Sequence, residues 1–197
     1  MGPGFRLVAW FFRTLLRVGW QLRVEGLDRL PPRGPFIITA NHASEIDPIV
    51  LSAAMPFRVT YLAGRELDRY PVLFALIRLF NPIFVRRGAP DVAAVKACLD
   101  RLARGEVLVV FPEGGVVQPG MGSLQPGAAF LAIRAQVPVV PVGLLGLARM
   151  LPLRARVPRP ARVTVRVGDP ILPPPDLRLI DDFTASIRRT LAALLGR

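Results

Sequence analysis

Two short groups of residues carry side chains that could take part in chemistry. The first, residues 41–48, places His42 five residues before Asp47. The second, residues 111–115, places Glu113 between a proline and two glycines. A carboxylate that binds one imidazole nitrogen fixes the tautomer and leaves the other nitrogen as a base. The first group therefore predicts general-base chemistry at His42, with a purely structural histidine as the alternative.

Each group follows a segment that has the composition of a buried strand. Residues 36–40 (FIITA) precede the first group, and residues 107–111 (VLVVF) lead into the second. Functional sites in α/β sheets gather beyond the carboxyl ends of the strands. Positions five apart on a helix point about 140° away from each other. His42 and Asp47 are therefore expected to meet only if His42 lies in a turn before a helix that begins near Asp47-Pro48.

The other elements follow from hydrophobic periodicity and from the glycine and proline breaks. Strands are predicted at residues 59–63, 82–85, 138–142 and 162–167, and helices at residues 70–80, 90–104, 128–135 and 177–195. Alternating strands and helices indicate an α/β fold. We expect a single domain in which helices flank a mixed, largely parallel sheet.

The N-terminal segment, residues 1–22, is predicted to form an amphipathic, membrane-associating helix ahead of a domain at residues 23–197. Arg6, Arg13 and Arg17 share one helical face, and bulky residues such as Trp10 and Trp20 occupy the rest of the surface. This composition is typical of a helix that lies in a membrane interface and is too charged to span a bilayer. The alternative is a helix packed on its own domain.

The composition excludes several classes of protein. Apolar residues make up 52% of the 197 residues, which excludes general disorder. One cysteine, Cys98, and one histidine exclude a disulfide scaffold and a multi-histidine metal site, so no metal is expected. The net charge of +12 attracts polyanions, and the apolar richness favours a lipid surface over nucleic acid. No signature of a common RNA-binding module is present, so a nucleic-acid partner is not expected.

Both polar groups and three further blocks resemble the glycerolipid acyltransferases, a family that includes the 1-acylglycerol-3-phosphate acyltransferases. Asn-His, four residues and Asp are followed, some 70 residues later, by Phe-Pro-Glu-Gly. Residues 23–27 are similar to the family's lead-in, residues 84–88 to its second block and residues 137–143 to its fourth block. The order and spacing match from about residue 20 to residue 172.

The resemblance implies an O-acyltransferase of phospholipid biosynthesis. Such an enzyme moves a fatty acyl group from acyl-CoA or acyl carrier protein, as co-substrate, to a hydroxyl of a lysophospholipid. The favoured acceptor is 1-acylglycerol-3-phosphate, which gives phosphatidic acid, and no cofactor is required. His42 would deprotonate the acceptor hydroxyl and Asp47 would orient His42, with no acyl-enzyme intermediate.

The resemblance also assigns the binding residues. Glu113 and Gly114 would bind the polar head of the acceptor, and Arg86 or Arg87 would neutralise its phosphate. Pro138 and Pro141, in the fourth block, would shape the acyl pocket.

Residues 115–117 depart from the family pattern. Gly-Val-Val stands where the family commonly has Thr-Arg, so a basic residue near the acceptor is missing. An acceptor with a different head group, such as an amino-acid lipid, therefore remains open, as do a non-catalytic membrane-binding module of the same fold and a thioesterase. The partners expected are a membrane lipid surface, the lysolipid acceptor and the acyl donor. The expected location is the cytoplasmic face of the membrane, peripheral or monotopic.

Overall fold

The structure is a computed structural model of the 197-residue chain. It describes residues 3–64, 82–86, 91–118, 121–153, 155 and 157–196, and the side chains from residue 10 onward within these ranges. The helix predicted at residues 70–80 and the candidate phosphate ligand Arg87 lie outside the described residues.

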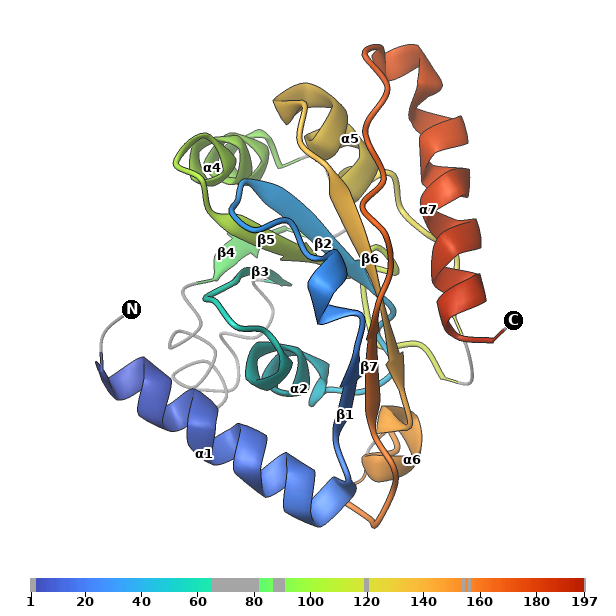
Figure 1. The fold of residues 1–197 in the computed structure, drawn as a ribbon. Helices are drawn as coiled ribbons and strands as arrows, with labels where there is room; N and C mark the ends of the chain where they lie inside the picture. Colours follow the sequence, from blue (N-terminus) through green and yellow to red (C-terminus); the bar gives the residue numbers. More distant parts are fainter. Residues whose placement is uncertain are drawn as a thin grey trace.

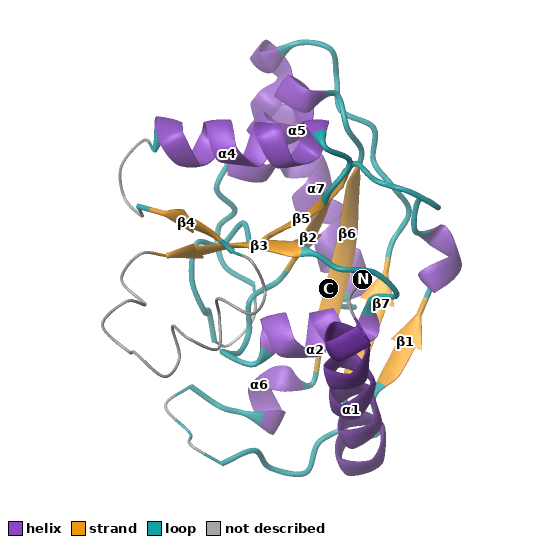
Figure 2. Cartoon of the chain, turned by 90° about the vertical axis from the view of Figure 1, so that its left-hand side faces the viewer, coloured by secondary structure: helices purple, strands orange, loops and turns teal. Residues whose placement is uncertain are grey.

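A seven-stranded sheet forms the centre of the molecule (Figures 1 and 2). The strand order is β1-β7-β6-β2-β5-β3-β4. Strands β6, β2, β5, β3 and β4 run parallel, whereas β7 is antiparallel to β6 and parallel to β1. The strands are β1 (Arg23–Glu25), β2 (Phe36–Ala40), β3 (Thr60–Gly64), β4 (Ile83–Val85), β5 (Val107–Val110), β6 (Val139–Leu145) and β7 (Thr164–Val167).

Helices cover both faces of the sheet. One face packs against α1 (Pro3–Trp20), α2 (Asp47–Ala54) and α6 (Leu147–Met150). The other face packs against α4 (Val92–Ala103), α5 (Gly127–Ala135) and α7 (Ile180–Leu194). Two 3₁₀ turns, Leu27–Arg29 and Leu177–Leu179, complete the described elements. The prediction of an α/β domain with a mixed, largely parallel sheet between helices is confirmed.

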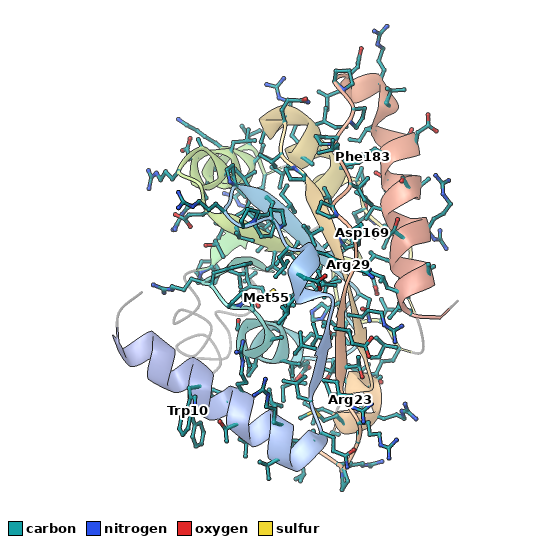
Figure 3. All side chains as sticks on the ribbon, in the orientation of Figure 1. Trp10, Arg23, Arg29, Met55, Asp169 and Phe183 are labelled. Carbon is teal, nitrogen blue, oxygen red and sulfur yellow. The ribbon has the colours of Figure 1, made fainter. Side chains whose placement is uncertain are left out.

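Burial of both faces of the sheet explains why the central strands are apolar throughout. In β2, Phe36 and Ile38 pack into the core on the α2 side, while Ile37 packs on the α5 side. A strand buried on both faces has no polar alternation and reads as a continuous apolar run. On the outer helix α7, by contrast, only the side that faces the sheet is apolar, and Phe183 lies between this helix and the sheet (Figure 3).

Helix α1 packs on α2 through part of its surface. Leu16 is buried in the core. The Arg13 guanidinium donates to the carbonyl oxygens of Ala53 and Ala54 at 2.6 and 2.9 Å, and it also reaches Met55. These carbonyls belong to the last turn of α2, where a cation complements the helix dipole. Burial, followed by the neighbouring Arg17, lowers the pKa of Arg13. Arg13 therefore caps the carboxyl end of α2. It does not contribute to the exposed arginine face that was expected of α1.

The opposite side of α1 is apolar and exposed. Trp10 is 63% exposed and Val18 is 81% exposed, with Phe11 and Leu15 between them. Trp10 points away from the rest of the molecule (Figure 3). In the described part of the chain, no helix has both the length and the apolar character needed to cross a bilayer. The interfacial role of residues 1–22 and their separation from residues 23–197 stay predictions.

Candidate active site

The strand register brings the two polar groups together. Strands β2 and β5 are parallel neighbours, and Thr39 pairs with Val110. The same offset of 71 residues continues beyond the strands, where the His42 backbone N–H donates to Oε1 of Glu113 at 3.2 Å. Both residues follow the carboxyl end of a buried strand. Two adjacent parallel strands therefore bring a histidine and a carboxylate to one edge of the sheet, as the sequence predicts.

His42 and Asp47 form a hydrogen-bonded pair. The distance from His42 Nδ1 to Asp47 Oδ2 is 2.9 Å. The Asp47 side chain is 0% exposed and the imidazole is 12% exposed. The same Oδ2 accepts from the backbone N–H groups of Ala43 at 2.7 Å and Ser44 at 2.9 Å. His42 thus lies in the turn before α2, which is the only arrangement in which residues five apart meet here.

The environment of Asp47 determines the state of the imidazole. Burial raises the pKa of Asp47, while the hydrogen bonds from His42, Ser44 and Ala43 oppose the rise. Three N–H donors on one oxygen favour the ionised carboxylate. Asp47 also begins helix α2, where the dipole favours a negative charge. The carboxylate holds the proton on Nδ1 and leaves Nε2 with a free lone pair.

Side chains outside the predicted set support this pair. Asn41 accepts from the N–H of Leu144 at 2.7 Å and donates to the Leu144 carbonyl at 3.0 Å, which joins the end of β2 to β6. Phe111 stacks on the imidazole of His42, with ring centroids 4.2 Å apart. Tyr61 in turn stacks on Phe111. The imidazole is therefore held at one nitrogen and covered on one face.

The segment after Glu113 also contacts the loop that carries His42 (residues 41–46, the histidine loop). The sequence did not predict this contact. The N–H of Val117 donates to the His42 carbonyl at 2.8 Å, and the Gln118 side chain donates to the Ala43 carbonyl. The one available signal was that Gln118 is a polar residue in the otherwise apolar stretch that continues Phe-Pro-Glu-Gly (residues 111–114, the third motif). A pairing across 75 residues cannot be read from that signal alone.

The other predicted residues lie at varied distances from His42. Arg86 is exposed at the carboxyl end of β4, on the same edge as His42 but three strand spacings, about 14 Å, along it. Gly114 is exposed in a turn with a φ of +73°, and a Cβ there would meet no atom within 4 Å. Pro141 is buried in β6 beside Thr39. Pro138 lies at the opposite edge, where its carbonyl accepts from Ile37.

A cysteine nucleophile does not fit the described site. Cys98 is buried in α4 on the far side of the sheet from α2, and burial, followed by Asp91, raises the pKa of its thiol to about 12. Thiolates, not thiols, are the reactive species. Among the described residues, no three or more His, Cys, Asp or Glu side chains are grouped so as to hold a metal ion.

An α/β domain with a buried His–Asp pair at the carboxyl edge of its sheet matches known proteins. A family model described as Acyltransferase matches residues 21–145, and the chain belongs to this acyltransferase family. The family predicted from the motifs is confirmed.

Curated relatives support the same grouping, and a solved structure shares the fold. The chain is 34% identical over 144 residues to the "1-acyl-sn-glycerol-3-phosphate acyltransferase beta" of Homo sapiens, covering 69% of this chain and 51% of that protein. It is 33% identical over 127 residues to a "Probable 1-acyl-sn-glycerol-3-phosphate acyltransferase" of Mycoplasma genitalium, covering 60% and 47%. The chain thus spans about half the length of these relatives. The fold is similar to the 1-acyl-sn-glycerophosphate acyltransferase PlsC of Thermotoga maritima, with a TM-score of 0.79, 24% identity and coverage of 98% of this chain and 80% of that one.

Proposed function

We propose that this protein transfers a fatty acyl group from a thioester donor to the free hydroxyl of 1-acyl-sn-glycerol-3-phosphate. The observation that carries the proposal is the 2.9 Å contact between His42 Nδ1 and the buried Asp47. This contact leaves Nε2 as the base, and the relatives are named for this acceptor. Acyl-CoA and acyl carrier protein that carries a fatty acyl group both present a thioester and suit the same chemistry.

The reaction requires one proton to move twice. His42 Nε2 takes the proton of the acceptor hydroxyl while its oxygen attacks the thioester carbonyl carbon. The tetrahedral intermediate then collapses, the C–S bond breaks, and the imidazolium returns the proton to the leaving thiolate. The Asp47 carboxylate stabilises the imidazolium between these steps. A positioned base contributes about 10²–10⁴-fold, which suits an already activated thioester.

Arg86 is our candidate partner for the acceptor phosphate. Its guanidinium is exposed at the same sheet edge as His42, and an arginine fork suits paired phosphate oxygens. Arg87 adjoins it in the sequence and is proposed for the same role. Gly114 leaves open space beside Glu113 into which a polar head fits. Pro141, buried one strand away from Thr39, is the nearer of the two prolines proposed to line the acyl chain.

We further propose that α1 attaches the protein to the cytoplasmic face of a membrane. Donor tail and acceptor are both amphiphiles, so the site must reach a lipid surface. The exposed apolar side of α1, with Trp10, Phe11, Leu15 and Val18, is suited to insertion among lipid head groups. The net charge of +12 attracts an anionic leaflet.

The test is a two-substrate assay with the purified full chain. Acyl-CoA or acyl carrier protein is supplied with vesicles that contain 1-acyl-sn-glycerol-3-phosphate, and both phosphatidic acid and free thiol are measured. We expect equal amounts of the two products, and Asp47→Asn is expected to lower kcat by about 10²-fold or more because the wrong tautomer is favoured.

Three results would contradict this proposal. Thiol release without acceptor would identify a thioesterase. Acylation of a lysolipid with another head group, but not of this one, would overturn the acceptor. Failure of every donor and acceptor pair, with vesicle binding intact, would indicate a non-catalytic membrane module.

A further inference from the structure

We propose that Glu113 and Gln118 are positioning residues that hold the backbone of His42 and Ala43, and thereby aim the imidazole at the reacting hydroxyl. This inference rests on the proposed role of His42 as the base. It gives the third motif a task that differs from contact with the head group of the acceptor.

Both main-chain polar groups of His42 are bound by the third-motif segment. Its N–H donates to Glu113 Oε1 at 3.2 Å, and its carbonyl accepts from the N–H of Val117 at 2.8 Å. Strand β2 has ended at Ala40, so the sheet no longer supplies partners for these groups. A buried backbone group without a partner is costly. Residues 113–117 therefore take over the pairing that β5 provides within the sheet.

Gln118 binds the next residue of the loop, Ala43, and also binds Leu153 in a third segment. Its Nε2 donates to the Ala43 carbonyl, and its Oε1 accepts from the N–H of Leu153 at 3.1 Å. Ser44, next in the loop, donates to the Leu151 carbonyl at 2.9 Å. Consecutive residues of the histidine loop are thus bound from outside the loop, in addition to the bonds from Asp47.

The carboxylate of Glu113 faces the protein. Oε1 accepts from the His42 N–H, and Oε2 is buried beside Gly122, whose backbone also acts on the carboxylate. A Cβ added at Gly122 would lie 3.5 Å from Oε2 and 3.1 Å from Val117, so the chain packs closely around the carboxylate. A group that binds the acceptor head would present a free oxygen to the ligand. This carboxylate presents its bound oxygen to the backbone of the base.

Hydrogen bonds that hold the main chain of His42 affect the rate because the imidazole nitrogen must lie close to the reacting hydroxyl and in line with it. Asp47 fixes one imidazole nitrogen and Phe111 covers one ring face, but neither contact holds the main chain of His42. A misplacement of about 1 Å at a reacting group costs on the order of 10²-fold in rate. Glu113 connects the loop to the segment that follows β5, and Gln118, together with Ser44, connects it to residues 151–153.

The experiment distinguishes the hydrogen-bonding role of the Glu113 side-chain oxygen from the role of its negative charge. Glu113→Gln keeps an oxygen that accepts from His42 but removes the charge, whereas Glu113→Leu removes both. We expect Glu113→Leu to lower kcat by about 10²-fold with the KM for 1-acyl-sn-glycerol-3-phosphate within about twofold. Glu113→Gln should recover most of that loss. Glu106→Leu, the same change at the other edge of the sheet, serves as the control for loss of a partly buried carboxylate.

Gln118 provides an independent pair of variants if Glu113→Leu does not fold. Gln118→Glu loses the donor to Ala43, and Gln118→Leu loses both bonds. Both are expected to lower kcat by about tenfold without a change in acceptor KM. An increase in acceptor KM at constant kcat, or a Glu113→Gln variant as poor as Glu113→Leu, would overturn the positioning role.

The single histidine of the chain offers a readout that does not depend on turnover. In tag-free protein every imidazole NMR signal belongs to His42. Glu113→Leu and Gln118→Leu are expected to shift or broaden these signals, and Glu113→Gln is expected to retain them. Unchanged imidazole signals in all folded variants would contradict the proposal. If the wild-type protein transferred no acyl group but the signals moved as expected, the proposed function would fail and the positioning role would stand.

Discussion

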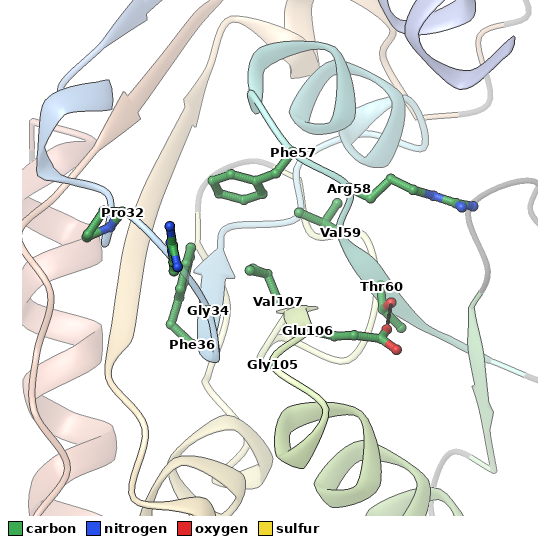
Figure 4. Close-up of a pocket in the computed structure, with 11 residues that line it drawn as sticks. Pro32, Gly34, Phe36, Phe57, Arg58, Val59, Thr60, Gly105, Glu106 and Val107 are labelled. Atoms are coloured by element: carbon green, nitrogen blue, oxygen red, sulfur yellow. Dashed lines mark hydrogen bonds between the residues drawn. The ribbon is translucent and has the colours of Figure 1, made fainter. Parts of the chain in front are cut away.

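The two edges of the sheet differ in what they hold. The amino edge encloses a cavity of about 490 Å³ lined by Phe36, Phe57 and Val107 together with Arg33 and other residues (Figure 4). Its carboxylate, Glu106, is bound to Thr60 and Arg101. The carboxyl edge holds the buried pair of His42 and Asp47.

The cavity and the candidate catalytic pair therefore lie at opposite edges of the sheet. The phenylalanine rings at the amino edge meet edge to face with centroids 5.6 Å apart, and none of its lining residues is a histidine or a cysteine. At the carboxyl edge the strands end together, so their loops converge and the helix α2 begins with its positive dipole end toward the loop. Convergent loops and a helix N-terminus thus surround the pair of His42 and Asp47.

The largest expected loss of activity comes from a change at the carboxyl edge. His42→Ala removes the proposed base and should lower kcat by about 10³-fold. Some fall in melting temperature is expected too, because the imidazole is only 12% exposed, stacks on Phe111 and is hydrogen-bonded to the buried Asp47. Phe57→Leu, a change in the cavity at the amino edge, should keep kcat within about threefold. Steady-state kinetics with 1-acyl-sn-glycerol-3-phosphate measures both. Comparable losses in the two variants would show that both edges take part in the reaction.

A second prediction concerns the exposed side of α1. The double variant Trp10→Ser, Val18→Ser should weaken binding to anionic vesicles by roughly 30-fold, because about 2 kcal/mol of apolar burial is lost. The matched control is Val92→Ser on α4, since Val92 is 79% exposed and Val18 is 81% exposed. Co-sedimentation with vesicles measures the partition. Equal binding of the two variants would place membrane attachment elsewhere than on this side of α1.

A third prediction tests whether the carboxyl edge extends along the sheet to β4. Arg86→Ala should raise the acceptor KM about tenfold and leave the donor KM unchanged, because a charge-assisted hydrogen bond to phosphate is lost. Arg104→Ala, an exposed arginine beside the amino edge, is the control. An acceptor KM that is unchanged in Arg86→Ala would exclude this residue as the phosphate partner.

The smallest expected effect is on stability. Burial raises the pKa of Glu113, and the nearby Asp47 adds to the rise, while the hydrogen bond from His42 opposes it. The folded state then retains a proton that the unfolded chain loses at lower pH, so this group makes the free energy of unfolding fall as pH rises between its unfolded and folded pKa values. Glu113→Gln should lack that component. Urea unfolding of both proteins from about pH 4 to pH 7 measures the two slopes, and parallel curves would show that the carboxyl titrates normally.

Much of the architecture follows from local patterns. The strand at Phe36–Ala40 was predicted with its observed bounds because five consecutive buried residues leave no ambiguity. The short strand β1 was not predicted, because its three residues pair with β7, some 140 residues away in the chain. The helix at Asp47 begins as expected, but the carboxylate serves the loop before the helix and does not cap its own helix.

The residue types of the candidate site and the strand ends that carry them could be predicted from local patterns, since they depend on composition and on neighbours in the chain. Three further features depend on the tertiary structure. The register of β2 and β5 brought Glu113 to the His42 backbone, the packing of α1 on α2 turned Arg13 inward, and the third-motif segment placed Gln118 against Ala43. Each involves partners 40 or more residues apart in the chain. Such contacts depend on which surfaces the folded core leaves adjacent, and no local pattern of residues encodes that choice.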